Sequence, residues 1–343
     1  MRVLLVSTLR DEGPHLLEWI AHHRAIGVDD FLMFSNDCSD GTDAMLDGLA
    51  PAGVVHVRND PQPGKSLQWT AFKAAWDHPL RNSASHILGI DSDEFVNLRA
   101  PLTDLAGLVA AADDPDAIVL PWRLFGHNGR ARLEPGLTTA QFTRAAPAGC
   151  DYPVGSRQFK TMFRADGPFR QIGVHRPRLK GKANGARWAD GSGQPMPNGF
   201  AKAEQRLTLY GLPDATDLVQ LNHYSVRSAE SFMIKRARGL PNRRGKSIDL
   251  TYWVERNFNI VEDTSIAHLA TATRAVLDQL LALPGMAALH GAAIANHHAK
   301  FETLMQDEAE LKLYGRLLLT ASSTPLADET VRELIARFRA NNV

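Results

Sequence analysis

The chain contains 343 residues, of which 44% are hydrophobic, as is typical of a globular protein with one large or two fused domains. Its 38 Lys and Arg residues balance its 38 Asp and Glu residues, so the formal net charge is +0. The balance lacks the strong positive excess that nucleic-acid binding requires, and we expect no nucleic-acid partner.

Short apolar runs alternate with helical patterns at the start of the chain. Leu16, Leu17 and Ile20 recur at helical spacing ahead of Gly27, a residue that commonly ends a helix. Strand, helix and strand in alternation are typical of a parallel sheet with right-handed crossovers. The expected elements are a strand at 3–7, a helix at 15–26, a strand at 31–34, a capped helix after 42 and a strand at 54–57.

Lys65 lies in a Gly-Lys-Ser triplet that opens the next expected helix, at 67–76. A phosphate loop of the Walker type needs an earlier glycine and a preceding strand, and residues 60–63 supply neither. Backbone N–H groups at a helix N-terminus still favour anions, so Lys65 could contact a phosphate of a ligand. The alternative is a solvated lysine.

The stretch 86–96 is an apolar run that ends in acidic residues. It is short and rich in branched residues, which favours a central strand of an α/β sheet, and ligands bind beyond the carboxyl ends of such strands. Asp91 and Asp93 alternate along an extended chain, so their side chains leave on the same face and could share one hard divalent cation. The competing interpretation makes them cap and turn residues.

The rest of the chain predicts further strands and then a helical tail. We expect one catalytic domain over 1–245 and an all-helical extension over 246–343. The tail carries many apolar positions, so it should pack on the catalytic domain or on another subunit, which makes an oligomer possible. The expected elements are a helix at 103–112, strands at 117–122, 159–163, 172–175 and 218–224, and helices at 228–238, 266–283, 286–319 and 331–338.

Several short motifs occur together in order. They begin with Asp11-Glu12, Leu17-Glu18-Trp19-Ile20 and a run from His22 to Val28, and they continue through Asn36 to Asp40, Asp91 to Phe95, Trp122 to Gly126, Lys160, His175-Arg176-Pro177 and His223 to Ser228. In this combination the chain resembles a bacterial family-2-like glycosyltransferase and is similar to glycosyltransferase family 92. The resemblance covers about Val3 to Gly239 and leaves out the tail.

The resemblance implies a GT-A type fold: an α/β structure with a mixed, mainly parallel sheet flanked by helices. It implies transfer of a sugar from a nucleotide-sugar donor to a hydroxyl acceptor, a glycan or a surface polysaccharide precursor. By matching motifs, Asp91 and Asp93 would hold Mn²⁺ or Mg²⁺ against the donor diphosphate, where a divalent cation stabilises the charge of the leaving group. The residues implied to contact the nucleotide sugar are Thr8, Arg10, Asp11, Glu12, Asn36, Asp37 and Asp91, to which the helix-start argument adds Lys65.

Three further residues have a functional and a structural interpretation. Glu94 could orient the acceptor or act as a base, or it could form a structural salt bridge. His223 could return to the site as a third metal ligand, or it could be a hydrogen-bonded core histidine. His175 is a weaker candidate for the catalytic site.

Two other function classes stay open. An apolar strand followed by Asp-x-Asp also occurs in metal-dependent phosphatases and phosphotransferases whose first aspartate is a nucleophile, although that interpretation expects the motif near the N-terminus. A non-catalytic relative could retain the fold and bind saccharide. Thermal unfolding measured with nucleotide sugars and Mn²⁺ discriminates these classes, because a ligand that binds specifically raises the unfolding temperature.

The two cysteines, Cys38 and Cys150, are too few for a disulfide framework and lack metal-ligand spacing, so a reducing compartment is expected. The apolar run at 3–6 is too short for a signal peptide, and no later run reaches the length of a transmembrane helix. The sequence therefore predicts a cytoplasmic protein.

Overall fold

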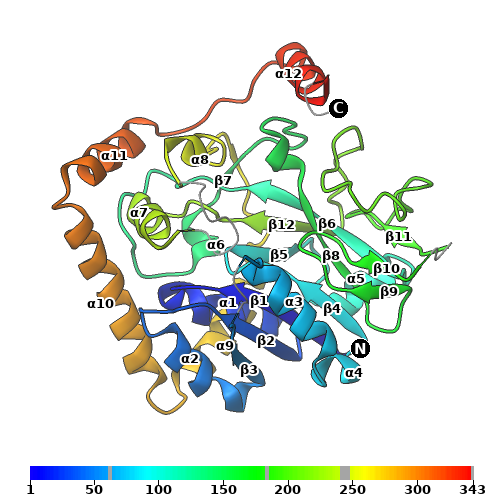
Figure 1. Ribbon diagram of the computed structural model, residues 1–343, viewed down its shortest axis with the longest axis horizontal. Helices are drawn as coiled ribbons and strands as arrows, with labels where there is room; N and C mark the ends of the chain where they lie inside the picture. The colour runs from blue at the N-terminus through cyan, green and yellow to red at the C-terminus, as the bar shows by residue number, and fades with distance from the viewer. Residues whose placement is uncertain (61–63, 182–184, 240–247, 341–343) are drawn as a thin grey trace.

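The computed structural model describes residues 1–343 except 61–63, 182–184, 240–247 and 341–343 (Figure 1). The predicted domain boundary at 245/246 lies outside the described residues.

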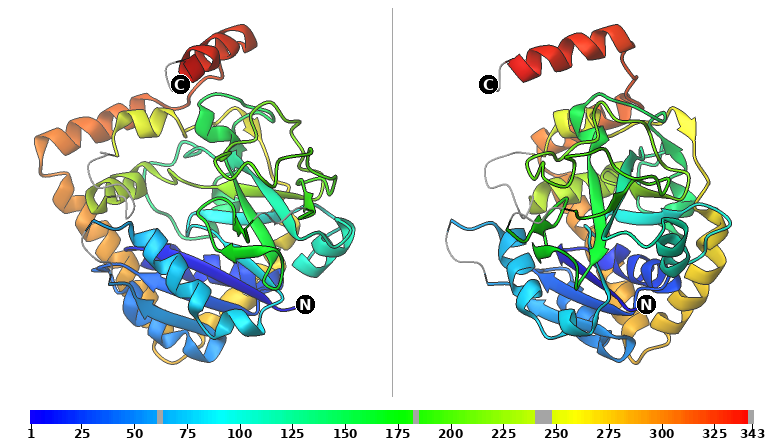
Figure 2. Two further views of the ribbon diagram at one scale, coloured as in Figure 1. Left: turned by 45° about the vertical axis from the view of Figure 1, so that its right-hand side comes forward. Right: turned by 90° about the vertical axis from the view of Figure 1, so that its right-hand side faces the viewer.

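A twisted central sheet forms the core of the molecule (Figures 1 and 2). Its strand order is β3-β2-β1-β4-β8-β6-β12-β5, and β11 pairs with β6. β8 and β5 run antiparallel to their neighbours and the other pairs are parallel. The fold class expected from the sequence, a mixed and mainly parallel sheet flanked by helices, is confirmed. The strands are β1 (Val3–Leu9), β2 (Asp30–Ser35), β3 (Val54–Arg58), β4 (His86–Gly89), β5 (Glu94–Leu98), β6 (Ala117–Leu124), β8 (Phe159–Arg164), β11 (Trp188–Ala189) and β12 (Val219–His223).

Both faces of the sheet are covered by apolar side chains from helices. β1 is buried along its whole length, which explains why it is apolar throughout instead of alternating. One face packs against α1 (Gly13–Ala25), α5 (Leu105–Ala111) and α9 (Ala270–Leu281), and the other packs against α3 (Leu67–Asp77). Two separate hydrophobic clusters therefore fix the position of the sheet.

The carboxyl ends of β1, β4, β6 and β12 lie at one edge of the sheet, because these strands run in the same direction. β5 runs the opposite way, so its first residue, Glu94, lies at that same edge. Residues 90–93 connect β4 to β5 there. The acidic motif thus lies where α/β sheets bind ligands.

Polar caps define the helices that flank this edge. The Ser66 hydroxyl accepts from the Trp69 N–H at the start of α3, and the Ser228 hydroxyl accepts from the Ser231 N–H at the start of α7 (Ala229–Arg238). The remaining elements are short or peripheral: α2 (Thr42–Gly48), α4 (Leu80–Ser83), α6 (Thr138–Gln141), β7 (Arg144–Ala145), β9 (Phe169–Gln171), β10 (Arg178–Leu179), α8 (Leu250–Val254), β13 (Val261–Glu262) and the 3₁₀ turns Ala50–Ala52, Val154–Arg157 and Ala267–Leu269.

Two expected elements were wrong, one in its extent and one in its existence. The helix expected at 286–319 is two helices, α10 (Met286–Leu304) and α11 (Glu308–Leu319), because the Asp307 carboxylate caps a new helix by accepting from the N–H groups of Ala309 and Glu310. The strand expected at 172–175 is absent, and β9 ends just before it.

The helical tail packs on the sheet domain, as the sequence predicted. Leu280, Met286 and Ala293 belong to the same hydrophobic cluster as α1 and β1, and Leu317 of α11 is buried in a cluster with α7 and α8. α12 (Asp328–Ala340) lies at the end of an extended segment (Figures 1 and 2), and its side chains Val331 and Ile335 are buried. Leu311 and Leu318 are exposed, and the expectation of an oligomer through the tail stays a prediction.

Among the described residues, no single helix has both the length and the apolar composition needed to cross a bilayer. One pair of helical segments, Ala267–Leu281 and Met286–Leu304, meets that composition only jointly and is bent by 103°.

Candidate active site

A cavity of about 580 Å³ opens at the carboxyl edge of the sheet, a volume suited to a small-molecule ligand. Segments far apart in the sequence line it: the loop after β1, the β4–β5 turn, the end of β12, helix α7 and residues after β10. Its lining includes Thr8, Arg10, Glu12, Ser66, Gln68, Trp69, Asp91, Asp93, Trp122, Gln158, His175, Arg178, Glu204, His223, Lys235, Arg238, Tyr252 and Arg256.

The turn between β4 and β5 holds the acidic motif in place. Glu94 accepts a hydrogen bond from the Asp91 N–H at 2.8 Å, and the Glu94 N–H donates to the Asp91 carbonyl oxygen at 3.1 Å. In the antiparallel pairing of β12 with β5, His223 lies opposite Glu94, and the Tyr224 N–H donates to the Asp93 carbonyl oxygen at 2.8 Å. This pairing brings His223 beside Asp93.

Asp93 and His223 form one half of a possible metal site. His223 Nε2 lies 3.5 Å from Asp93 Oδ1, which allows both atoms to bind one ion at about 2.0–2.2 Å. Burial raises the pKa of Asp93, but the Lys235 ammonium and the contact with His223 outweigh this effect and hold that pKa well below its usual value. Burial lowers the pKa of His223. At neutral pH the pair is therefore an anionic oxygen and a neutral imidazole, the protonation states that metal ligands need.

Asp91 is engaged differently. Its Oδ2 accepts from Lys160 Nζ at 2.9 Å and its Oδ1 accepts from Gln68 Nε2 at 2.9 Å. The Lys160 side chain has no exposed surface. Burial lowers the pKa of Lys160, but the carboxylates of Asp91 and Glu94 outweigh this effect and raise it. Both oxygens of Asp91 thus carry partners, and its predicted metal contact stays a prediction.

In the described part of the chain, no group of three or more His, Cys, Asp and Glu side chains is arranged to hold a metal ion. Asp93 and His223 would therefore supply two ligands, and donor phosphates and water would supply the others. This is the usual way in which Mg²⁺ is bound at phosphate sites, through one or two carboxylates. The two residues fit a divalent cation only if a bound molecule or water supplies its other ligands.

Glu94 and His175, the two proposed catalytic residues, lie in different surroundings. Glu94 is fully buried, does not line the cavity, and lies 3.6 Å from Lys160 Nζ. Burial raises its pKa well above the usual value. Its position supports the turn, and it gives no direct support to a catalytic role. His175 does line the cavity.

His175 is held in one tautomer. Its Nδ1 lies 3.0 Å from the Phe159 carbonyl oxygen and donates to it, so Nε2 carries the lone pair. Burial is the main cause that lowers the pKa of His175 to about 4, so the ring is neutral at pH 7. The ring of Trp122 lies 5.7 Å from His175 and 4.2 Å from His223 between centroids. These three rings form an aromatic wall of the cavity.

The loop after β1 divides between the cavity and the scaffold. Thr8, Arg10 and Glu12 line the cavity, whereas the Asp11 carboxylate accepts from the Ser39 N–H at 2.5 Å, outside the lining. Glu12 Oε2 accepts from Arg227 Nη1 at 2.8 Å.

Helix α7 closes this arrangement, because Arg238 also pairs with Glu12. Burial raises the pKa of Glu12, but the charges of Arg238 and Arg227 outweigh this effect, and the pKa lies well below its usual value. Glu12 therefore connects helix α7 to the loop after β1. A nucleotide that contacts the Glu12 carboxylate, as predicted, would compete with Arg227 and Arg238 for its oxygens.

Besides Asp11, three more predicted nucleotide-binding residues lie outside the cavity lining. Asn36 is buried and its Nδ2 donates to the Leu9 carbonyl oxygen at 3.1 Å, which fixes the end of β1. Asp37 and Lys65 are exposed, although Ser66, the neighbour of Lys65, does line the cavity. The structure does not bring these three side chains to the other predicted residues, and their nucleotide contacts stay predictions.

Several cations surround these acids, and the basic cluster Lys235 to Arg238 was open in the sequence to two interpretations, a phosphate contact or a solvated face. Lys235 and Arg238 are three residues apart and therefore share a face of α7, a signal that the sequence did contain. Lys160 could not have been found in this way, because β8 brings it to Asp91 only through strand pairing with β4.

Comparison with known proteins gives limited information. No known protein family matches the chain, and no curated protein is significantly similar to it. Similar solved structures include TarS of S. aureus in complex with UDP, which is 15% identical over 48% of this chain and 46% of that chain, with a TM-score of 0.30. TarS 1-349 of S. aureus is 12% identical over 89% of this chain and 92% of that one, with a TM-score of 0.32.

HddC from Yersinia pseudotuberculosis is 12% identical over 48% of this chain and 76% of that chain, with a TM-score of 0.26. At these identities and TM-scores the likeness carries no argument about function, so the function has to be argued from the site. The resemblance to glycosyltransferase family 92 likewise stays a prediction.

Proposed function

We propose that this protein is a glycosyltransferase that moves a sugar from a nucleotide-sugar donor to a hydroxyl acceptor with the help of Mn²⁺ or Mg²⁺. The observation that carries the proposal is the Asp93–His223 pair, two ligand atoms 3.5 Å apart on the wall of a cavity of about 580 Å³. Thr8 and Arg10 line the same cavity where the resemblance places the nucleoside.

Asp93 and His223 would hold the cation, and the donor diphosphate would complete its coordination. When bound, such a cation stabilises negative charge on phosphate oxygens as a Lewis acid. An imidazole ligand departs from the all-oxygen coordination that Mg²⁺ prefers, so the two cations have to be compared by experiment. Asp91 pairs with Lys160 and also lines the cavity, where its carboxylate would accept hydrogen bonds from hydroxyl groups of the nucleotide sugar.

In the proposed reaction the bond between the anomeric carbon and the phosphate oxygen breaks, and its electron pair stays on the nucleoside diphosphate. A new bond forms between the anomeric carbon and the acceptor oxygen, and the acceptor hydroxyl proton must leave. His175 Nε2, the unprotonated nitrogen of a cavity-lining imidazole, is our candidate to accept that proton or to orient the hydroxyl. Trp122, beside it, offers an apolar face to a sugar ring.

The test is a donor screen. Purified protein is incubated with a panel of nucleotide sugars and Mn²⁺ or Mg²⁺, and release of nucleoside diphosphate is measured with and without a mixture of saccharide acceptors. We expect release with one donor, dependence on the cation, and loss of release in Asp93→Asn. The control is Glu134→Gln, which alters an exposed acid that does not line the cavity.

The same screen separates the alternatives. Release of inorganic phosphate in place of nucleoside diphosphate would support the phosphatase or phosphotransferase class. Thermal stabilisation by a nucleotide sugar and Mn²⁺ without turnover of any donor would support a non-catalytic binding protein. No stabilisation and no turnover across the panel would contradict the proposed function.

A further inference from the structure

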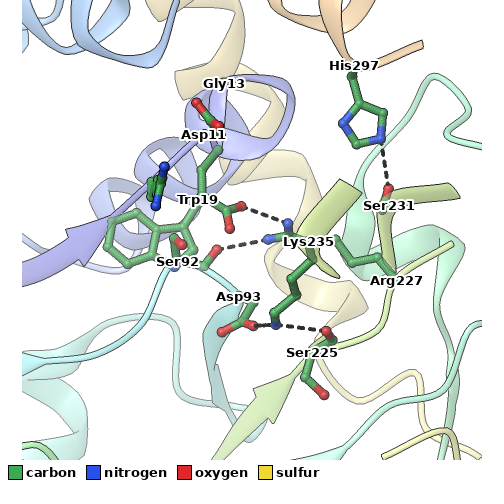
Figure 3. A network of polar contacts seen from close by, with 12 residues as sticks. Asp11, Gly13, Trp19, Ser92, Asp93, Ser225, Arg227, Ser231, Lys235 and His297 are labelled. Atoms are coloured by element: carbon green, nitrogen blue, oxygen red, sulfur yellow. Dashed lines mark hydrogen bonds and ion pairs between the residues drawn. The ribbon is translucent and has the colours of Figure 1, made fainter. Parts of the chain in front are cut away.

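Lys235 points toward Asp93 of the acidic motif, and both residues line the cavity (Figure 3). It extends from helix α7, and its Nζ donates to Asp93 Oδ2 at 2.7 Å and to the Ser225 carbonyl oxygen at 2.9 Å. The side chain is 13% exposed and lines the cavity. Two of the three ammonium N–H donors are thus used by acceptors that the structure describes, which leaves one for a ligand oxygen.

The carboxylate of Asp93 is shared between two partners. Oδ1 lies 3.5 Å from His223 Nε2, and Oδ2 accepts from Lys235. A divalent cation bound by Asp93 and His223 would lie within a few ångströms of the Lys235 ammonium, where like charges repel strongly because the surroundings are partly desolvated. The free energy of cation binding therefore includes the cost of weakening or breaking the Asp93–Lys235 ion pair.

The neighbouring cations are held more firmly. Lys160 is fully buried between Asp91 and Glu94, at 2.9 and 3.6 Å. Arg238 is fixed by the Glu12 carboxylate and by the carbonyl oxygens of Arg10 and Asp11. Among the described residues, Lys235 contacts one carboxylate, one carbonyl oxygen and the Tyr252 ring, which lies 5.4 Å from its Nζ. It has a flexible four-carbon stem and is neither enclosed between two carboxylates like Lys160 nor held by a guanidinium with several acceptors like Arg238, so of these three cations it changes partner most readily.

Given the function proposed above, on which this inference rests, we propose that Lys235 is an exchangeable counter-ion of Asp93 and a ligand of the donor diphosphate. In the unliganded protein it neutralises Asp93. When a divalent cation takes Asp93 and His223, Lys235 turns to the phosphate oxygens. Its N–H then donates to the oxygen that receives the electron pair of the broken glycosyl bond, and this contact strengthens as that oxygen gains charge.

The first consequence concerns the metal alone and needs no sugar donor. Lys235→Met keeps the apolar stem and removes the competing charge. Mn²⁺ binding to nucleotide-free protein, measured by the loss of the free Mn²⁺ electron paramagnetic resonance signal, should become roughly tenfold tighter in Lys235→Met. The control is Lys312→Met on α11, which removes an exposed lysine that pairs with Glu308 and does not line the cavity, and it should leave the affinity unchanged. Equal or weaker Mn²⁺ binding in Lys235→Met would overturn the competition.

The second consequence concerns the affinity for phosphate, which Lys235→Met should lower instead of raise. In the presence of saturating Mn²⁺, inorganic pyrophosphate should bind Lys235→Met more weakly than wild type by about 10-fold or more, because a charge-assisted hydrogen bond is lost. Lys312→Met should again match wild type. A structural role for Lys235 alone would weaken both ligands together, so tighter metal with weaker pyrophosphate is a signature specific to the exchange. Unchanged pyrophosphate affinity would refute the phosphate contact.

A measurement on the wild-type protein covers the case in which Lys235→Met fails to fold. The reactivity of each lysine toward a small acetylating reagent is measured by mass spectrometry with and without Mn²⁺. Release from Asp93 should raise the labelling of Lys235 severalfold, whereas buried Lys160 stays unreactive and exposed Lys312 stays constant. Unchanged labelling of Lys235 at a Mn²⁺ concentration that saturates the protein would contradict the exchange.

The failure of this inference is distinguishable from the failure of the proposed function. If wild-type protein binds Mn²⁺ and pyrophosphate and turns over a donor, but Lys235→Met behaves like wild type, only the role of Lys235 is wrong. If wild-type protein binds neither Mn²⁺ nor pyrophosphate, the proposed function fails and this inference fails with it.

Discussion

Glu12→Gln is the substitution that most directly tests how the cavity is held together. Glu12 is 3% exposed, and its two carboxylate oxygens pair with Arg227, which follows β12, and with Arg238 of helix α7. Arg227 also donates to the Ser92 carbonyl oxygen at 3.0 Å, so the network reaches the acidic turn (Figure 3). Glutamine fills nearly the same volume but leaves two buried guanidinium charges without an anion.

Removal of one partner from a buried ion pair costs about 3–5 kcal/mol, because the remaining charge stays desolvated. We expect a loss of that size in the free energy of unfolding of Glu12→Gln, measured by urea denaturation. The control is Glu134→Gln, which breaks a pair with Arg130 whose acid is 54% exposed on its side chain. Exposed pairs contribute at most about 1 kcal/mol, so the control should be nearly unchanged.

A double substitution sharpens the test. Removal of Arg238 together with the acid, in Glu12→Gln/Arg238→Met, eliminates one of the two uncompensated charges. It should therefore recover at least about 1 kcal/mol relative to the sum of the single substitutions. A Glu12→Gln protein that loses less than about 1 kcal/mol, or a double variant with purely additive losses, would refute the view that Glu12 is the electrostatic centre of this junction.

Three further predictions concern the site, the tail and pH. Asp93→Asn should abolish cation-dependent turnover and Mn²⁺ binding while far-ultraviolet circular dichroism stays unchanged; near-normal turnover with Mn²⁺ would contradict the metal assignment. A chain ending at residue 264 should be insoluble, because it removes Leu280 and Met286 from the main core. Of the described residues, a chain ending at Ala327 loses only the buried side chains Val331 and Ile335 of α12, which belong to no core cluster, and it should stay soluble. Solubility of both, seen by gel filtration, would show that the tail is dispensable. Burial lowers the pKa of His22 to about 4, so below pH 6.5 the unfolded chain takes up a proton that the folded chain excludes. The contribution of His22 to the free energy of unfolding should be complete above pH 6.5 and should fall by about 1.4 kcal/mol per pH unit as the pH drops toward 4. Urea denaturation at pH 7.5 and pH 5 measures this fall, and His22→Asn should make the pH dependence shallower.

Much of the fold followed from local pattern. Buried strands such as β1 read as unbroken apolar runs because both faces of the sheet are covered, and helix ends such as Gly27 carry their own signal, a φ of 97° that glycine adopts readily. The break between α10 and α11 was missed, although Asp307 is a typical cap, because the apolar periodicity continues across it.

The acidic motif was also readable. An apolar strand followed by Asp91 and Asp93 predicts a polar site at the edge of a sheet, and the structure places both residues in the cavity lining. The approach of His223 to Asp93 was a prediction of the sequence that the 3.5 Å separation supports, because the strand that carries His223 ends at the same edge.

The counter-ions of these acids were decided only by the tertiary structure. Lys160 reaches Asp91 across a strand pair, Lys235 reaches Asp93 from a helix 142 positions along the chain, and the two arginines of Glu12 come from more than 200 positions away. Local sequence determines whether a segment is apolar, polar or capped, since those properties depend on neighbours within a few residues. Which charge neutralises which depends on strand order and helix packing, because electrostatic partners are selected by distance in space.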